Sequence, residues 1–397
     1  AVFKIRMNTD GVDNGREGIR IAEFDVIEKP SANGGHRPFM AVIDVSKING
    51  PSPQPFADET VDGAELLLVT NDCSGYGLPS GVCIDRTSPG SSDLDDLRCP
   101  ISAPPAVYTE GGLAQAFYFG DWCGQIWRVS TDDSGSTWEA TRILRVNEQF
   151  DPSSPDPNVV SRQLRKFERR LDLFVTGCQG TRAVGVSFGT GSINRPGAVD
   201  DLITPTAAPA VTNYYEGRDV VGTLFDTGIT SPLRLSFGTN PDNTCGGTCL
   251  TDVTQIDGAN PGAAGFKGFF FALRDDERML RDSLTIDGIT FYPTYQVTTA
   301  ATICQAGVGV DRVYAIDNCT SEPAPANGTS TGNPLDDRVA EENANGTIGG
   351  DLFVITPADG PPIVASGNMS TQREADLLRS NSQRGFRILF WYQPEEL

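Results

Sequence analysis

The chain has 397 residues, a formal net charge of −21 and a single histidine. An acidic surface repels nucleic acid and anionic membranes, so we expect neither as a partner. No stretch approaches the ~20 apolar residues that a membrane helix needs. His36 lies in a glycine-rich loop without an evident catalytic partner, which favours a surface position and speaks against histidine catalysis.

The N-terminal part of the chain predicts short strands joined by long polar connections. Residues 71–107 are rich in turn-forming residues, hold three cysteines and predict an ordered insertion. The chain begins in a strand-like run without a signal peptide, which indicates a processed or trimmed chain. The expected strands are Val2–Met7, Phe39–Val45, Glu65–Thr70, Ala116–Phe119, Gln125–Val129 and Ala140–Val146.

Residues 161–170 form a basic island in an acidic chain. This segment could contact an acidic partner, but a loop or short helix salt-bridged to the protein's own surface is the favoured interpretation. Residues 197–212 and 239–264 are rich in Gly, Pro, Asn, Thr and Ala and predict loops. The strands expected between these segments are Asp172–Thr176, Ala183–Phe188, Asp219–Phe225 and Leu233–Phe237.

Residues 267–317 read as four short strands in a row. Gly268–Leu273 is apolar and aromatic, Met279–Leu284 follows a charged turn, and Ile289–Tyr295 and Arg312–Ile316 complete the set. The first of these runs is apolar almost without a break, which is typical of a strand buried on both faces. Four-stranded sheets stacked face to face around an axis bury both faces, so the pattern predicts a β-propeller.

The rest of the chain fits the same all-β architecture. We expect loop over residues 320–348 and strands at Asp351–Thr356 and Phe386–Tyr392. About 400 residues, at four strands and long loops per blade, predict a single domain over residues 1–397 with about seven degenerate blades. Pairing between Val2–Met7 and Phe386–Tyr392 would close the ring and leave no exposed edge.

Three segments carry a family resemblance. Residues 267–317 combine Glu277-Arg278, a Thr-Phe-x-x-Thr-Tyr strand, Cys-x-x-Gly and a Tyr-Ala-Ile-Asp strand. Phe117–Val129 contains Phe-Tyr-Phe-Gly-Asp followed by Gly-x-x-Trp-Arg, and Ala183–Gly191 ends in Phe-Gly-Thr-Gly. In order and motif they resemble the C-terminal propeller of PilY-type proteins, the tip-associated biogenesis factors and adhesins of type IV pili. The resemblance covers roughly residues 110–320.

The resemblance implies a protein that acts through its shape, by binding other molecules. We expect an exported protein of the cell surface or pilus that acts as a structural, adhesive propeller, with pilin or minor pilins and host or surface ligands as partners. The family's N-terminal von Willebrand A-like domain is not visible here. The alternative is a quinoprotein-type propeller dehydrogenase. That chemistry is associated with adjacent cysteines, a calcium-bound quinone and an Asp base, and the chain has no adjacent cysteines. We therefore expect that the protein is not an enzyme and binds no cofactor.

The nine cysteines favour disulfides and export, because most lie in turn-like sequence and none forms a Cys-x-x-Cys motif. Short loops are closed by the pairs Cys73–Cys83, Cys245–Cys249 and Cys304–Cys319, which we expect as disulfides. A zinc site at Cys245 and Cys249 lacks a second pair of ligands nearby. The odd number leaves one thiol, or a pair with another chain.

Calcium is the one metal for which the sequence offers candidates. Asp93, Asp95 and Asp96, and separately Asp10, Asp13 and Asn14, resemble parts of a calcium loop without its full spacing. In PilY-type propellers that bind calcium, the loop precedes the Tyr-x-Gly-Asp strand. Residues 108–116 occupy that place with one carboxylate, Glu110, so we expect no calcium there.

Three further motifs have a structural interpretation. Asp121 and Asp317 follow strand ends and could ligate a metal, but bonding to the turn backbone is the default. Phe188–Gly191 resembles a phosphate loop without its spacing or helix, so a strand exit is the better interpretation. The sequons at Asn318, Asn327, Asn345 and Asn368 predict exposed loops.

Overall fold

The computed structural model describes residues 4–5, 24–25, 39–43, 54–55, 65–74, 82–110, 113–131, 138–146, 165–178, 180, 182–192, 218–235, 247–297, 309–324, 331–343, 351–355 and 363–365. The chain divides into two compact units, Ala1–Arg170 with Gly228–Leu233 and Leu171–Thr227 with Arg234–Leu397. Within the described residues the only helices are the 3-10 helix η2 (Ser92–Asp96) and α2 (Pro334–Asp337), so the all-β expectation is confirmed. None of the described helices is long and apolar enough to cross a membrane.

The first unit contains an antiparallel meander, β7-β8-β9-β10, and a smaller sheet, β3-β5-β4 with β6 on β5. Both sheets contribute to one apolar cluster, in which Leu67 and Val69 of β5 join Phe119 and Trp127 of the meander. The elements are β1 (Lys4–Ile5), β2 (Phe24–Asp25), β3 (Phe39–Ile43), β4 (Gln54–Pro55), β5 (Glu65–Thr70), β6 (Cys83–Ile84), β7 (Ala106–Glu110), β8 (Leu113–Gly120), β9 (Gln125–Thr131) and β10 (Trp138–Arg145).

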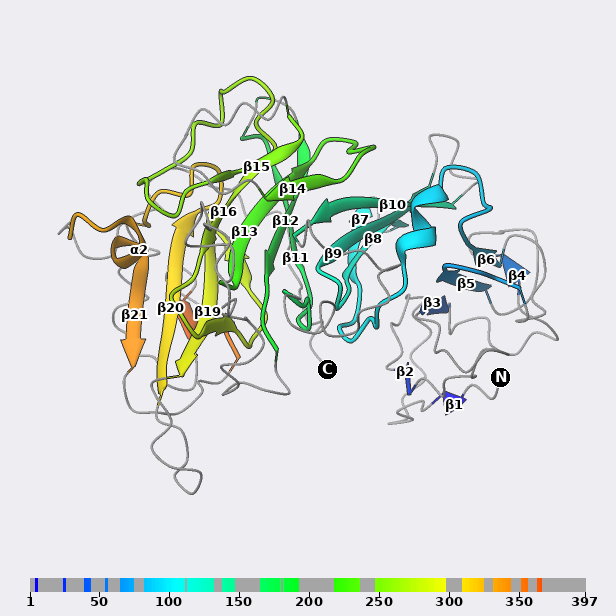
Figure 1. The fold of residues 1–397 in the computed structure, drawn as a ribbon, viewed down its shortest axis with the longest axis horizontal. Helices are drawn as coiled ribbons and strands as arrows, with labels where there is room; N and C mark the ends of the chain where they lie inside the picture. Colours follow the sequence, from blue (N-terminus) through cyan, green and yellow to red (C-terminus); the bar gives the residue numbers. More distant parts are fainter. Residues whose placement is uncertain are drawn as a thin grey trace, which may run out of the picture. The chain divides into compact units, whose positions relative to one another are not determined.

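The second unit contains a sheet ordered β11-β12-β13-β16-β15-β14 and a second sheet ordered β17-β19-β20-β21, with β18 on β19 (Figure 1). The strands of the first are β11 (Asp172–Thr176), β12 (Ala183–Gly189), β13 (Val220–Asp226), β14 (Leu233–Leu235), β15 (Cys249–Asp252) and β16 (Gly268–Ala272). Those of the second are β17 (Glu277–Met279), β18 (Leu284–Ile286), β19 (Ile289–Val297), β20 (Gly309–Asp317) and β21 (Val339–Asn343). A separate hairpin joins β22 (Phe353–Ile355) to β23 (Ile363–Ala365).

The two sheets of the second unit share a core. Val221 and Phe271 of the first sheet belong to the same apolar cluster as Met279, Tyr292 and Tyr314 of the second. Aromatic side chains fill most of this layer, and Phe271 packs edge-on against Tyr292 with ring centroids 6.2 Å apart. Burial of such large side chains is the main favourable term in holding two sheets together.

The strand Gly268–Ala272 is buried along its whole length, as its continuous apolar sequence predicts. Its sheet membership differs from the expectation of four consecutive strands in one sheet. β16 pairs with β13 and β15, whereas β17, β18, β19 and β20 form the other sheet. A chain turn at residues 273–276 therefore carries the backbone from one layer to the other, and β16 gains a hydrogen-bonded neighbour on each side.

Two strands and a helix occur where the sequence predicts loop. β15 lies inside residues 239–264, and α2 and β21 lie inside residues 320–348. All three are short, and the two strands depend on partners elsewhere in the sequence: β15 pairs with β14 and β16, and β21 pairs with β20. Local pattern does not encode such pairings.

The ring closure expected from the terminal strands stays a prediction. β1 pairs with β2, through Lys4 opposite Asp25 and Ile5 opposite Phe24. The expected last strand, Phe386–Tyr392, lies outside the described residues. The single propeller domain over residues 1–397 likewise stays an expectation.

Candidate functional site

The turn between β8 and β9 encloses a buried carboxylate. Asp121 has no exposed surface, and its Oδ1 accepts the backbone N–H of Gln125 at 3.0 Å. Its Oδ2 accepts the Gln125 side-chain amide and the Trp127 indole N–H, each at 3.0 Å. The backbone N–H of Cys123, two residues on, also bonds to this carboxylate. The default interpretation of Asp121 as a turn residue is therefore confirmed, and Gln125 and Trp127 are partners that the sequence analysis did not foresee.

Burial raises the pKa of the Asp121 carboxyl to about 7, against the hydrogen bonds from Trp127, Gln125 and Cys123, which lower it. Arg142 joins this network through Gln125. Arg142 donates to Gln125 Oε1 at 2.7 Å and to Asp96 at 2.6 Å. The motif residues Asp121, Gln125 and Trp127 thus hold the turn in place rather than present a reactive group.

A second buried network involves the motif residue Glu277. Its side chain is fully buried, and its Oε1 accepts the Thr294 hydroxyl at 2.6 Å and Arg312 at 3.5 Å. Its Oε2 accepts the Tyr314 hydroxyl at 2.9 Å and the backbone N–H of Arg274 at 3.1 Å. Burial, followed by the neighbouring Glu277 carboxylate, raises the pKa of Tyr314 well above its usual value. Tyr314 therefore stays protonated and donates to Glu277.

The same network continues to the surface. Arg312 also bonds to Gln296 at 2.8 Å and to the half-exposed Glu342 on β21 at 2.8 Å. Arg274 contacts both Tyr314 and Asp336 of α2. The charges are paired across β17, β19, β20, β21 and α2, so the network joins five elements and leaves its central carboxylate no open position for a ligand.

The segment Phe188–Gly191 is a strand exit, as expected. Thr190 is fully buried, donates to Asp219 at 2.6 Å and accepts the backbone N–H of Val220 at 2.9 Å. Gly191 has φ +155°, and a Cβ there would lie 2.7 Å from the Met279 carbonyl oxygen. Glycine is needed because the backbone passes close to the neighbouring sheet. No helix follows within the described residues, 191–192.

The acidic residues proposed as calcium ligands are engaged by arginines. Asp95 pairs with Arg86 and Arg98, each at 3.1 Å, and Asp96 pairs with Arg142 at 2.6 Å. Asp93 accepts the backbone N–H of Arg142 at 3.4 Å. Among the described residues no group of three or more Asp, Glu, His or Cys is placed to hold a metal ion. The second candidate set, Asp10, Asp13 and Asn14, lies outside the described residues.

Residues 108–110 and 113–116 belong to the antiparallel pairing of β7 with β8. Tyr108 lies opposite Ala116, and Glu110 lies opposite Leu113. Glu110 is exposed and accepts the Tyr108 hydroxyl at 3.3 Å. A strand pairing directs successive side chains to opposite faces, so it does not converge oxygens on one ion. The expectation of no calcium at this segment stays a prediction.

Three disulfides are formed among the described cysteines. The expected Cys73–Cys83 pair is confirmed, with Cα atoms 6.1 Å apart. The others are Cys99–Cys123, with Cα atoms 5.6 Å apart, and Cys178–Cys319, with Cα atoms 5.4 Å apart. Cys249 is also disulfide-bonded. Cys245, its expected partner, lies outside the described residues, as does Cys304.

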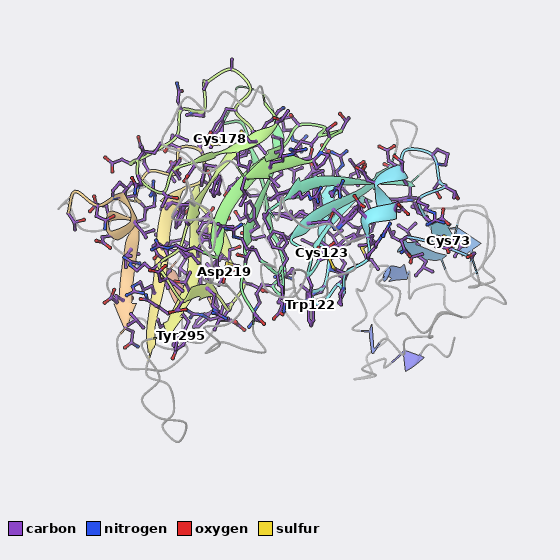
Figure 2. All side chains as sticks on the ribbon, in the orientation of Figure 1. Cys73, Trp122, Cys123, Cys178, Asp219 and Tyr295 are labelled. Carbon is purple, nitrogen blue, oxygen red and sulfur yellow. A yellow bond between two sulfur atoms is a disulfide. The ribbon has the colours of Figure 1, made fainter. Side chains whose placement is uncertain are left out.

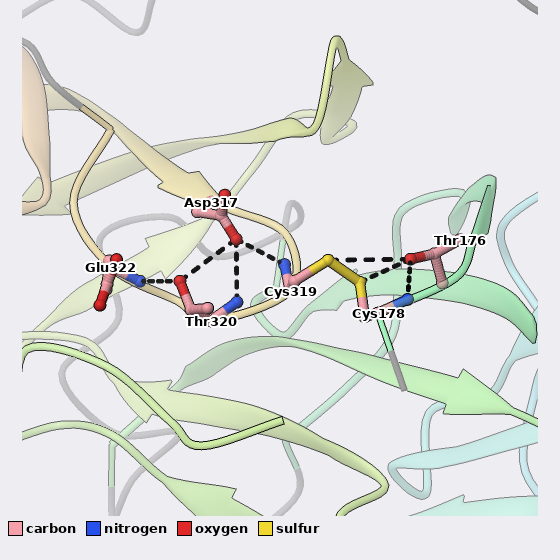
Figure 3. Close-up of a disulfide and its surroundings, with 6 residues drawn as sticks. All are labelled: Thr176, Cys178, Asp317, Cys319, Thr320 and Glu322. Atoms are coloured by element: carbon pink, nitrogen blue, oxygen red, sulfur yellow. Dashed lines mark hydrogen bonds between the residues drawn. A yellow bond between two sulfur atoms is a disulfide. The ribbon is translucent and has the colours of Figure 1, made fainter. Parts of the chain in front are cut away.

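The expected pair Cys304–Cys319 is wrong, because Cys319 is bonded to Cys178 across 141 residues of sequence. The turn at Asp317 explains the placement (Figure 3). Asp317 Oδ1 accepts the backbone N–H groups of Cys319 and Thr320, each at 2.9 Å. This confirms Asp317 as a turn residue. Thr176, the last residue of β11, lies beside both sulfur atoms. Sequence spacing favours short loops and does not reveal that two distant turns meet.

The described part of the basic island, residues 165–170, packs on its own unit. Arg165 is buried and donates to the Val146 carbonyl at 3.2 Å, and the backbone N–H of Phe167 donates to the Asp121 carbonyl at 3.1 Å. These residues form a loop that is hydrogen-bonded to its own unit. The salt bridges expected for the island stay a prediction. The sequon residue Asn318 is buried, contrary to the expected exposed loop. Asn327, Asn345 and Asn368 lie outside the described residues.

No protein-family model matches the chain, and no curated protein matches it. Among solved structures, the chain is similar to the crystal structure of the Pseudomonas aeruginosa PilY1 C-terminal domain, with a TM-score of 0.39 and 13% sequence identity. The match covers 67% of this chain and 59% of that chain, which is less than two thirds of its length. This is a distant structural similarity.

Proposed function

We propose that this chain is a type IV pilus-associated surface protein that acts as a rigid binding scaffold and has no catalytic role. In this proposal it contacts pilin or minor pilins, takes part in pilus biogenesis or adhesion at the tip, and has the architecture of a β-propeller of about seven blades.

One observation carries the proposal: the motif residues that resemble PilY-type propellers have structural roles. Asp121 and Trp127 hold a buried turn, Glu277 and Tyr314 form the centre of a charge network, and Gly191 allows close contact between sheets. Residues in these roles maintain the shape of the fold, which supports a function that depends on shape. A protein that acts by presenting a rigid surface needs buried hydrogen bonds and close backbone contacts of this kind.

The disulfides support a location outside the cytoplasm. Three disulfides link described residues, and disulfide bonds persist in oxidising compartments. A rigid scaffold presents its surface loops at low entropic cost, which favours binding.

The test is cross-linking of the full chain to pilins in the source organism, together with deletion of its gene. We expect cross-links to major or minor pilins, and fewer surface pili or weaker surface attachment after deletion. Complementation with the unaltered gene should restore both. Unchanged pili and attachment with no pilin cross-links would contradict the proposal. A visible absorption band from a quinone in the purified protein would support the dehydrogenase alternative instead.

A further inference from the structure

Arg338 is a buried arginine at the end of α2 in the second unit, with 1% of its surface exposed. It is the C-cap residue of the helix and directly precedes β21 (Figure 1). Its backbone carbonyl accepts the N–H of Ala315 on β20 at 2.9 Å. The backbone of this residue is therefore fixed to the sheet, while its guanidinium is enclosed by protein.

Three backbone carbonyls surround the guanidinium, and they come from the segment after β15, the turn after β20 and α2. Nε donates to the Ser321 carbonyl at 3.0 Å, Nη1 to the Pro334 carbonyl at 3.4 Å and Nη2 to the Ile256 carbonyl at 2.5 Å. The guanidinium carbon also lies over the Phe271 ring, 5.2 Å from the ring centroid. A guanidinium presents its donors in a rigid planar fork, so one group can hold three acceptors in fixed directions.

The charge of Arg338 is compensated by these carbonyls and not by a salt bridge. The buried Arg281 pairs directly with Asp311, whereas Arg338 forms no ion pair among the described residues. Burial lowers the pKa of Arg338 to about 10, so the side chain stays charged at neutral pH. Three acidic residues counter this effect through space: Asp257, Asp252 and Asp337. A buried charge is unfavourable unless polar partners replace its water, so the three carbonyls are needed to hold this cation.

The turn after β20 is tightly constrained around its carbonyl. Ser321 is fully buried and has φ +62°, a left-handed conformation that is uncommon for a residue other than glycine. The backbone N–H of Ala259 donates to the Thr320 carbonyl at 2.6 Å, which joins the segment after β15 to this turn. Cys319 of the same turn is bonded to Cys178, which Figure 2 labels. Carbonyl oxygens that converge in a buried place need a donor between them, and Arg338 supplies it.

We propose that these three segments form a cation site whose natural occupant is the guanidinium of Arg338, and that the site accepts a free guanidinium ion when this side chain is removed. The planar arrangement of donors favours guanidinium over a spherical ion. Because one group holds all three segments, its loss lets them open locally while the strands keep their pairing. This inference does not depend on contact with pilins, so it can fail while the proposed function stands, and the reverse.

The test is amide hydrogen exchange of the full chain and of Arg338→Ala. The amide of Ala259 reports the contact between the segment after β15 and the turn after β20, and it should exchange at least about tenfold faster in the variant. Guanidinium chloride at about 20 mM, far below the molar range in which it denatures proteins, should reverse most of this change and leave the unaltered chain as it is. Urea at the same concentration has a similar planar shape without the charge, and neither urea nor sodium chloride should reverse it.

Arg338→Lys provides a second variant if Arg338→Ala does not fold. Its ammonium keeps the charge but lacks the planar fork, so the exchange rate of Ala259 should lie between those of the unaltered chain and Arg338→Ala. The amide of Phe225, bonded to the Lys267 carbonyl at 2.8 Å, is the internal control and should be unchanged. Arg86→Ala removes an exposed arginine of the first unit and should leave Ala259 unchanged with or without guanidinium.

Four outcomes would each overturn the inference. The first is an unchanged exchange rate of Ala259 in Arg338→Ala, and the second is equal acceleration at Ala259 and Phe225, which would indicate general destabilisation. The third is a failure of guanidinium to slow exchange in Arg338→Ala, or equal slowing by urea or sodium chloride. The fourth is exchange in Arg338→Lys at the rate of the unaltered chain, which would show that the guanidinium fork is not needed.

Discussion

The hydroxyl of Tyr314 on β20 donates to Glu277 Oε2 on β17 at 2.9 Å, across the intervening strand β19. The two strands are not neighbours, so this contact spans the sheet through side chains. It is one of several hydrogen bonds that replace the lost hydration of the buried Glu277 carboxylate. A buried carboxylate costs several kcal/mol unless its partners replace water, so each partner of Glu277 carries a measurable share of stability.

We predict that Glu277→Gln lowers the free energy of unfolding by about 3–5 kcal/mol, because it removes the fully buried carboxylate that pairs with both Arg274 and Arg312. Tyr314→Phe should cost about 1–3 kcal/mol, since it removes one donor to Glu277. Urea unfolding measures both. The control is Asp275→Asn, which breaks an ion pair whose carboxylate is 65% exposed and should cost at most about 1 kcal/mol. Equal losses in Glu277→Gln and Asp275→Asn would contradict the argument.

The buried Asp121 predicts a pH dependence of stability. Its pKa is raised from 3.8 to about 7 in the folded chain, so the folded state holds a proton that the unfolded state has lost. Stability from this group is therefore fully present below about pH 4, declines as pH rises, and is level above about pH 7. The total change is on the order of 4 kcal/mol, at 1.36 kcal/mol per pKa unit.

The measurement is the urea midpoint between pH 4 and pH 8 for the unaltered chain and for Asp121→Asn. The variant has no titrating group at this position, so the difference between the two proteins should change across this window. Asp121→Asn should also be less stable than the unaltered chain at every pH. The new amide has one NH2 group in place of a carboxylate oxygen, and this donor would face the N–H donors of Gln125 or Trp127. A constant difference from pH 4 to pH 8 would show that the N–H donors keep Asp121 ionised.

The disulfides predict a graded loss of stability on removal. Closing a loop of 141 residues restricts the unfolded chain more than closing one of 10 residues. Replacing Cys178 and Cys319 with serine should therefore cost about 5 kcal/mol, and replacing Cys73 and Cys83 about 3 kcal/mol, in the chain-entropy model. Mass spectrometry of a non-reduced digest should detect the Cys178–Cys319 peptide pair. Detection of Cys304 bonded to Cys319 would disprove the pairing.

We predict that calcium does not bind at Asp93, Asp95 and Asp96, since arginines already pair with Asp95 and Asp96. Calcium takes 6–8 oxygen ligands, and displacing these arginines would leave their charges unpaired. Asp95→Asn should leave a calcium titration by calorimetry unchanged. Glu110→Gln should also leave it unchanged. Micromolar binding that either substitution abolishes would refute the corresponding prediction.

The sequence by itself determined the local features of this protein. Apolar runs gave many of the strand positions, and the run Gly268–Ala272 correctly indicated a strand buried on both faces. The expected strand Met279–Leu284 is wrong, because β17 ends at Met279 and β18 begins at Leu284. The turn roles of Asp121 and Asp317 and the Cys73–Cys83 pair were also foreseen. Each of these depends on residues within about ten positions of one another, where periodicity, turn chemistry and spacing act directly.

Only the tertiary structure decided which distant segments meet. It assigned β16 to the sheet of β13 and placed Cys319 beside Cys178. It also paired Asp96 with Arg142, 46 positions away in the sequence. The physical reason is that long-range pairing is chosen by burial and charge compensation over the whole unit, and many arrangements share the same local pattern.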